Sequence, residues 1–173
     1  MRIWRITASK HIDTVFSGVG GLYASGRWHH QGYKISYTSE SLALASLEVL
    51  VHLETIDIPL ACVSGIVPES TPILEMKDLP SNWQYVSVYP ILQESGRKWL
   101  RAIEYPVLKV PSAIVPVEFN YLINPEHPDL NLKVEQVLKF EFVGVGEASR
   151  WRSLSERREA SPLENRRMWK NQS

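Results

Sequence analysis

Apolar and polar side chains alternate over residues 1–7, and this period of two predicts a β-strand. The apolar and β-branched residues of four later segments predict further strands, at residues 32–38, 60–68, 107–119 and 132–142. Pro111 and Pro116 make the segment 107–119 an edge strand or an interrupted one, because proline donates no hydrogen bond to a neighbouring strand.

A helix is predicted from Ser39 to about Leu53, with Ser39 as its N-cap and Glu40 in its first turn. This segment is apolar almost all the way round, which indicates a buried helix. A second, shorter helix is predicted around residues 91–103, and loops are predicted over 13–26, which is rich in glycine, and 120–128, which is rich in turn residues. Strands that come first and last, with helices inserted, predict a single α+β domain around a mixed or antiparallel sheet.

Composition and charge restrict the function classes. The length of 173 residues fits one domain, residues 1–147, followed by a polar, arginine-rich tail, residues 148–173. Residues 147–173 carry a net charge of +3, which leaves −3 on residues 1–146 because the whole chain is neutral, so we expect no direct DNA binding. The N-terminus has no secretory pattern and no apolar run is long enough to span a membrane, so a cytoplasmic protein is expected.

Glu48 lies in the middle of the first predicted helix, where an ionised carboxylate is costly unless a partner binds it. Arg5 and Arg27 have apolar and aromatic neighbours in the sequence and need an anion, either a fixed carboxylate or a bound phosphate. Two interpretations stay open. Arg27 and Glu48 form a structural ion pair in a non-catalytic binding module, or these side chains line a site.

Two further residues are ambiguous from their position alone. Tyr37 ends a predicted strand just before the helix of Glu48, where a tyrosine either stacks on a flat ring or packs in the core. Ser112 lies in a predicted strand, where a serine by itself is most simply structural. We expect His52, four residues after Glu48, to face the core or to pair with that carboxylate.

The spacing of the reactive residue types argues against several enzyme classes. His29 and His30 are adjacent, and Glu48 with His52 lacks the second histidine of the zinc peptidases, so no metal site is predicted. The chain has no Gly-x-Ser-x-Gly sequence, which argues against a serine hydrolase. Cys62, the single cysteine, lies in an apolar run without nearby positive charge and is predicted to be inert.

Six short segments occur in the order in which one known family has them. They are Trp4-Arg-Ile6, Gly26-Arg-Trp-His29 with Gly32 following, Tyr37-Thr-Ser-Glu-Ser41, Leu47-Glu-Val-Leu-Val-His-Leu53, Val110-Pro-Ser-Ala-Ile-Val-Pro116 and Asn120-Tyr-Leu-Ile-Asn-Pro-Glu-His-Pro128. Over residues 3–142 the chain therefore resembles the RES domain family, which is named for its arginine, glutamate and serine.

The resemblance implies a toxin of a bacterial type II toxin–antitoxin system, with a fold similar to the ADP-ribosyltransferase toxins. Its partner would be an antitoxin with an Xre-type helix-turn-helix domain. NAD⁺ would be a consumed substrate rather than a cofactor, cleaved at the nicotinamide–ribose bond by a glycohydrolase or phosphorylase; the alternative is transfer of ADP-ribose to a host protein. The acceptor, the oligomeric state and the antitoxin contact surface stay open.

Carried over by position, the family's residues assign roles to side chains of this sequence. The catalytic residues would be Glu48, Arg27 and Ser112. NAD⁺ would be bound by Arg5, Arg27, Tyr37 and Ser112. In these roles Glu48 would stabilise positive charge on the ribose, the arginines would bind the pyrophosphate or keep Glu48 ionised, and Tyr37 would stack on nicotinamide.

Overall fold

The computed structural model describes residues 1–52 and 58–142. Within this part, Met1–Phe140 form one compact unit with α-helices packed on a mixed sheet, so the predicted α+β class is confirmed. The predicted tail, residues 148–173, and the predicted end of the first helix at Leu53 lie outside the described residues. No helix in the described ranges is long and apolar enough to cross a membrane.

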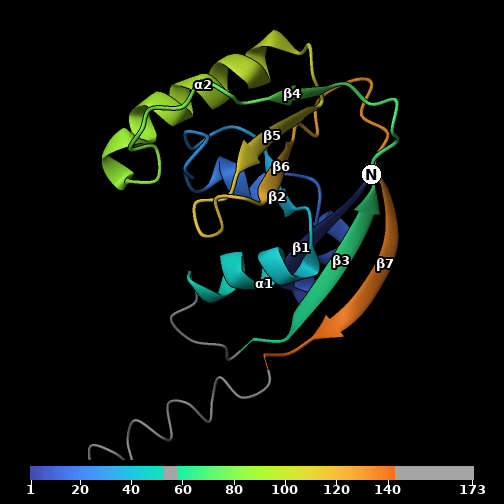
Figure 1. The fold of residues 1–173 in the computed structure, drawn as a ribbon. Coiled ribbons are helices and arrows are strands. Elements are labelled where there is room, and N and C mark those ends of the chain that lie inside the picture. Colours follow the sequence, from blue (N-terminus) through green and yellow to red (C-terminus); the bar gives the residue numbers. More distant parts are fainter. Residues whose placement is uncertain (53–57, 143–173) are drawn as a thin grey trace, which may run out of the picture. The chain divides into compact units, whose positions relative to one another are not determined.

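The described strands form one sheet in the order β4-β5-β6-β2-β1-β3-β7 (Figure 1). Their bounds are β1 Arg2–Ala8, β2 Ser36–Ser39, β3 Leu60–Ile66, β4 Ile73–Glu75, β5 Val107–Pro111, β6 Phe119–Ile123 and β7 Lys133–Phe140. Neighbouring strands are antiparallel except β4 and β5, which are parallel. Two α-helices, α1 Leu42–Leu50 and α2 Tyr89–Ala102, and three 3₁₀ helices, η1 Ser9–Thr14, η2 Val19–Leu22 and η3 Val86–Val88, connect the strands.

The sheet is opened at its centre, between β1 and β2. These two strands share the single register pair Trp4 and Ser39, whereas β1 pairs with β3 along its whole length and β2 pairs throughout with β6. The next residue of β1, Arg5, donates from Nη1 to the carbonyl oxygen of Tyr37 at 3.2 Å and to Oγ of Ser36 at 2.8 Å. A side-chain donor therefore satisfies a backbone carbonyl of β2 that the strand ladder does not.

The N-terminus of α1 differs from the prediction. Ser39 is not the N-cap, because it remains in β2 with its backbone paired to neighbouring strands. Ser41 caps the helix instead, since its Oγ accepts the N–H of Leu44 at 3.0 Å. Glu40 therefore precedes the cap rather than lying in the first turn.

The prediction of a buried first helix is wrong for most of its described residues. Of the residues of α1, Leu44 and Ala45 are buried, while the side chain of Leu47 is 39% exposed. His52, just after the helix, is also exposed, and no hydrogen bond in the described residues joins it to Glu48. The helix packs against β1 and β2 with one face, which leaves part of its apolar surface uncovered by the described residues.

The segment 107–119 is interrupted, which is one of the two predicted alternatives: β5 ends at Pro111, β6 begins at Phe119, and β4 and β6 flank β5. The predictions for two other segments need correction. The predicted loop 120–128 begins inside a strand, since residues 120–123 belong to β6 and pair with β2. The three-residue strand β4 was not predicted, and residues 32–35 lie outside β2.

The second helix, α2, agrees with the prediction to within about two residues at each end, which is the usual uncertainty of helix ends. It packs on a core cluster that also contains strands β5 and β6; the buried members are Trp28, Ile35, Val88, Leu92, Trp99, Leu100, Leu108, Val110 and Leu122. The helix approaches the segment around Trp28 at Gly96, where an added Cβ would lie 1.8 Å from the Trp28 carbonyl oxygen. No residue larger than glycine fits this contact without movement of backbone.

Gly96→Ala is expected to destabilise the protein by about 1–3 kcal/mol, the usual cost of overpacking, although alanine favours a helix over glycine by about 1 kcal/mol. Urea unfolding followed by circular dichroism measures the change. Gly20→Ala is the matched control, since nothing lies within 4 Å of a Cβ at that position. A more stable Gly96→Ala protein would show that the helix does not contact the Trp28 backbone in this way.

Candidate active site

A cleft of about 700 Å³ is lined by residues of β1, β2 and α1, next to the opening in the sheet. It contains a carboxylate, two guanidinium groups and several aromatic side chains; these include Glu48, Arg5, Arg27, Trp4, Trp28, Tyr37 and Tyr89. The volume lies within the range of small-molecule sites, about 300–1,000 Å³. The structure therefore brings together four of the five predicted site residues, and Ser112 lies behind the lining.

The carboxylate of Glu48 has neutral partners. Its Oε1 accepts a hydrogen bond from Oγ of Ser112 at 2.9 Å and one from Nδ2 of Asn120 at 2.6 Å. No ion pair with Arg27 or Arg5 occurs among the described residues, so the interpretation of Arg27 and Glu48 as a structural ion pair is wrong there. No hydrogen bond in the described residues uses Oε2, which leaves that oxygen for a ligand.

Ser112 is fully buried and does not line the cleft. Its Oγ accepts the backbone N–H groups of Ile114 and Val115, both at 3.1 Å, so its one hydroxyl hydrogen is directed to Glu48. In this arrangement Ser112 acts on Glu48 rather than on a ligand, which differs from the expected direct contact with NAD⁺.

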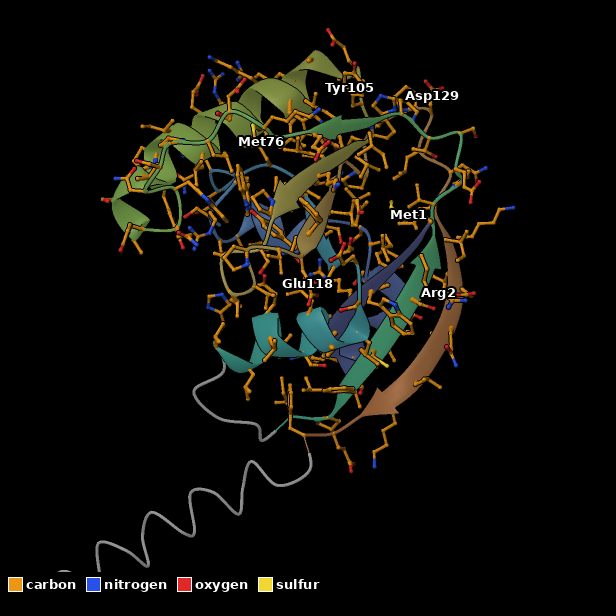
Figure 2. All side chains as sticks on the ribbon, in the orientation of Figure 1. Met1, Arg2, Met76, Tyr105, Glu118 and Asp129 are labelled. Carbon is orange, nitrogen blue, oxygen red and sulfur yellow. The ribbon has the colours of Figure 1, made fainter. Side chains whose placement is uncertain are left out.

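The connection between β5 and β6 also contacts the N-terminus of α1. Ser41 donates from its Oγ to Oε2 of Glu118 at 3.3 Å, and Figure 2 shows Glu118 on the side of this connection that approaches α1. The same loop thus contacts α1 at its cap and, through Ser112, at Glu48. These contacts fix the helix that carries the carboxylate.

Arg27 projects from a tight turn between Gly26 and His29, whose backbones form an isolated β-bridge. Its guanidinium carbon lies 4.6 Å from the ring centroid of Tyr89 and 5.7 Å from that of Trp83, distances typical of cation–π contacts. Nη1 donates to the carbonyl oxygens of Trp83 at 3.1 Å and Gln84 at 2.8 Å. Nη2 and Nε have no hydrogen bond in the described residues, so the guanidinium keeps two donors for an anion.

Tyr37 both packs on the core cluster and lines the cleft, so its sequence-based alternatives are not exclusive. Its hydroxyl accepts the N–H of Trp28 at 3.2 Å and lies 2.8 Å from Nδ1 of His29. Nε2 of His29 must donate to the carbonyl oxygen of Ala24 at 3.0 Å, because a carbonyl only accepts. In the neutral ring Nδ1 therefore accepts from Tyr37, and burial raises the pKa of the Tyr37 hydroxyl, which keeps it protonated.

Arg5 is the cation with the fewest compensating contacts in the cleft. Its Nε is buried and has no hydrogen-bond partner in the part of the chain that the structure describes, and burial lowers the pKa of its guanidinium. The partners of its Nη1, Ser36 and Tyr37, are uncharged acceptors. An incompletely compensated cation that lines a cleft is suited to an anionic ligand.

The sequence did not reveal three contributors to this site. Asn120 binds Glu48, and Trp83 and Tyr89 hold Arg27. The sequence did contain a signal for Asn120, because this residue begins the last of the six family-like segments. The segment was predicted to be a loop, however, so the pairing of Asn120 with β2 was not expected. Within the described residues, no group of three or more His, Cys, Asp or Glu side chains is placed to hold a metal ion.

Known proteins resemble this chain over most of its length. The family model described as the RES domain matches residues 2–144. A protein named Toxin Res from Photorhabdus laumondii is 35% identical over 145 residues, which cover 82% of this chain and 93% of that protein. A protein named Prs ADP-ribosylating toxin from a Sphingobium species is 36% identical over 148 residues, which cover 80% of this chain and 92% of that protein.

A solved structure has the same fold. The crystal structure of the Mycobacterium tuberculosis MbcT–MbcA toxin–antitoxin complex contains a chain that matches with a TM-score of 0.67 and 15% identity, over 80% of this chain and 83% of that one. This likeness supports the α+β architecture, in agreement with the fold expected from the family resemblance.

Arg5→Met is expected to lower the free energy of unfolding by about 1–3 kcal/mol, because the Tyr37 carbonyl and the Ser36 hydroxyl lose their donor, while no carboxylate partner of Arg5 is stranded within the described residues. Pyrophosphate should raise the melting temperature of wild type more than that of the variant, since a ligand that binds the folded state stabilises it. Thermal unfolding with and without pyrophosphate measures both effects. A loss of about 3–5 kcal/mol in the variant would instead assign Arg5 to the structural framework.

Stability is expected to fall as the pH drops below about 6.5, in part through His29. Burial lowers the pKa of this ring below its ordinary value of 6.5, so the unfolded chain takes up a proton that the folded protein resists. The loss begins near the unfolded pKa and continues until the folded pKa is reached. Urea unfolding between about pH 7.5 and 5.5 should give a smaller pH dependence for His29→Gln, whereas His11→Gln, at an exposed histidine, should match wild type. Equal pH dependence in all three proteins would contradict this role.

Proposed function

Because this chain belongs to the RES domain family, we propose that it is the toxin of a toxin–antitoxin system and that it consumes NAD⁺ by cleaving the nicotinamide–ribose bond. The observation that carries the proposal is the state of Glu48. Its carboxylate is held through one oxygen by neutral donors, while the other oxygen is left for a ligand in a cleft that also contains Arg5 and Arg27.

Cleavage of the glycosidic bond needs a fixed negative charge beside the ribose. As nicotinamide leaves with the bonding electron pair, positive charge develops on the ribose carbon C1″, and the Glu48 carboxylate stabilises it electrostatically. Water then adds to C1″ and releases one proton, which gives ADP-ribose, nicotinamide and H⁺. Inorganic phosphate in place of water gives the phosphorylase reaction.

The remaining side chains bind the two ends of the dinucleotide. Nε and Nη2 of Arg27, which no side chain or backbone group binds within residues 1–52 and 58–142, are suited to pyrophosphate oxygens, and Arg5 adds a second cation in the same cleft. Tyr37, fixed at its hydroxyl by His29, offers a ring surface on which nicotinamide can stack. NAD⁺ is in this scheme a substrate, and no separate cofactor takes part.

A second candidate is a protein ADP-ribosyltransferase that uses the same cleft. The 36% identical relative from Sphingobium, named an ADP-ribosylating toxin, favours it. The two reactions share the departure of nicotinamide and differ only in the nucleophile that reaches C1″. The residues discussed here would have the same roles in both.

A toxin of this kind needs a partner that silences it. We infer an antitoxin with an Xre-type helix-turn-helix domain, and a structural neighbour of this chain is itself part of a toxin–antitoxin complex. The antitoxin would supply the DNA binding, because residues 1–146 have a net charge of −3 and attract no polyanion. A cytoplasmic location follows from this proposal, since the substrate and the partner are found there.

Glu48→Gln is expected to keep the fold and to lower the rate of nicotinamide release by about 10²–10³-fold or more, the usual effect of removing one electrostatic stabiliser. The glutamine carbonyl oxygen can still accept from Ser112 and Asn120, so the melting temperature should change little. Chromatography of NAD⁺ breakdown products, with and without phosphate, measures the rate and identifies the acceptor.

Glu69→Gln is the matched control, because Glu69 is exposed and lies outside the cleft. NAD⁺ labelled in its adenosine half distinguishes the alternatives, since a transferase labels a host protein in near-stoichiometric amount. Both reactions would be refuted if the wild-type protein, freed of its partner, released no nicotinamide either in the presence or in the absence of host proteins.

A further inference from the structure

Asn120 links Glu48 to the sheet through a chain of hydrogen bonds. Oγ of Ser39 lies 2.7 Å from Oδ1 of Asn120, and Nδ2 of Asn120 lies 2.6 Å from Oε1 of Glu48. Ser39 and Asn120 are direct register partners on neighbouring central strands, β2 and β6. The site's carboxylate is therefore tied to the paired strands β2 and β6 and not only to its own helix.

The direction of this chain is determined by chemistry. A carboxylate only accepts, so the group of Asn120 that faces Glu48 must be the NH₂ group. The amide oxygen then faces Ser39, whose hydroxyl donates to it. Ser39 is 4% exposed, which shields this bond from competition with water.

Both donors to Glu48 use the same oxygen. Asn120 approaches Oε1 from β6, and Ser112 approaches it from the end of β5. Two donors from different strands restrict the rotation of the carboxylate and leave Oε2 unbound among the described residues. Neutral donors also differ from a cation in their effect, because they orient the carboxylate without cancelling its charge.

We propose that Asn120 is a positioning residue of this site, which holds the carboxylate of Glu48 so that Oε2 and not Oε1 faces the ribose of the bound nucleotide. This role rests on the proposed function, since it explains how the carboxylate of Glu48 is oriented toward C1″ of the ribose. Ser39 extends the role by fixing the orientation of the Asn120 amide.

Asn120→Asp tests the proposal most directly, because it replaces a donor by a second carboxylate of the same shape. The two carboxylates then repel each other or share a proton. The kcat of nicotinamide release should fall by about 10–100-fold, the effect reported for loss of an orienting partner at metal ligands, and KM for NAD⁺ should change by less than about threefold. The acidic limb of the kcat profile should move to higher pH, since a neighbouring like charge raises a carboxyl pKa.

Two further variants keep the test independent of folding. Asn120→Ala removes the donor without adding charge, so kcat should fall with a smaller movement of the acidic limb. Ser39→Ala leaves Asn120 in place and should lower kcat by less than Asn120→Ala. Asn131→Asp is the matched control, because Asn131 is exposed and outside the cleft, and it should retain wild-type kcat and pH profile. The other titratable groups that line the cleft are unchanged in every variant; they are Arg5, Arg27, Tyr37, His52 and Tyr89.

The outcomes separate the two proposals. Suppose that wild type cleaves NAD⁺ and that Asn120→Asp and Asn120→Ala fold and have the same kcat as wild type. That result would overturn the positioning role and leave the proposed function intact. If wild type releases no nicotinamide, the proposed function fails, and titration of the carbon-13-labelled Glu48 carboxyl by NMR still tests the contact. A higher apparent pKa in Asn120→Asp than in wild type supports it, and an identical titration overturns it.

Discussion

The opening between β1 and β2 is the constraint on which the rest of the structure depends. Two central strands that pair at one position leave backbone groups without ladder partners, and such groups must be satisfied in another way. Arg5 does this for the Tyr37 carbonyl with its side chain, which places a guanidinium inside the sheet. The same opening forms the wall of the cleft, so the cation is held where a ligand can reach it. A continuous ladder would be better hydrogen-bonded and would have no site there.

The guanidinium of Arg27 and the carboxylate of Glu48 are held in the cleft by different kinds of contact. Arg27 contacts two aromatic rings and donates from Nη1 to two carbonyl oxygens, so its planar group is fixed while Nε and Nη2 have no hydrogen bond in the described ranges. Glu48 is fixed by neutral donors at Oε1, and no described residue binds its Oε2. Because neither charge is used to neutralise the other within the described residues, both stay available to a ligand. Strong mutual pairing would be a more ordinary way to bury them, and it would consume the binding capacity of both.

The sequence predicted the parts of the fold that local pattern determines and missed those that long-range pairing determines. The strands at β1, β3 and β7 and the helix α2 follow from period and composition. Ser39 and Ser41 are equally good caps by residue type, and pairing with β6 decides between them by keeping Ser39 in a strand. Long-range pairing also explains why Asn120 was predicted to lie in a loop. Its neighbours Asn124 and Pro125 favour turns, but pairing with β2 keeps Asn120 in a strand. Glu48 is anomalous on its helix from the sequence alone, but no spacing could show that its partners are a hydroxyl 64 residues away and an amide 72 residues away.

The strand order also determines when the site can exist during synthesis. Its residues come from β1, the turn before β2, α1 and finally β6, whose pairing with β2 brings Asn120 to Glu48. A chain on the ribosome that has not yet exposed β6 has the arginines and the glutamate but lacks the strand that pairs with β2 and carries Asn120. Since strand pairs that are distant in sequence slow folding, such a nascent chain lacks the assembled cleft through most of its translation. Under the proposed function, a silencing partner is therefore needed only after β6 has emerged and paired with β2.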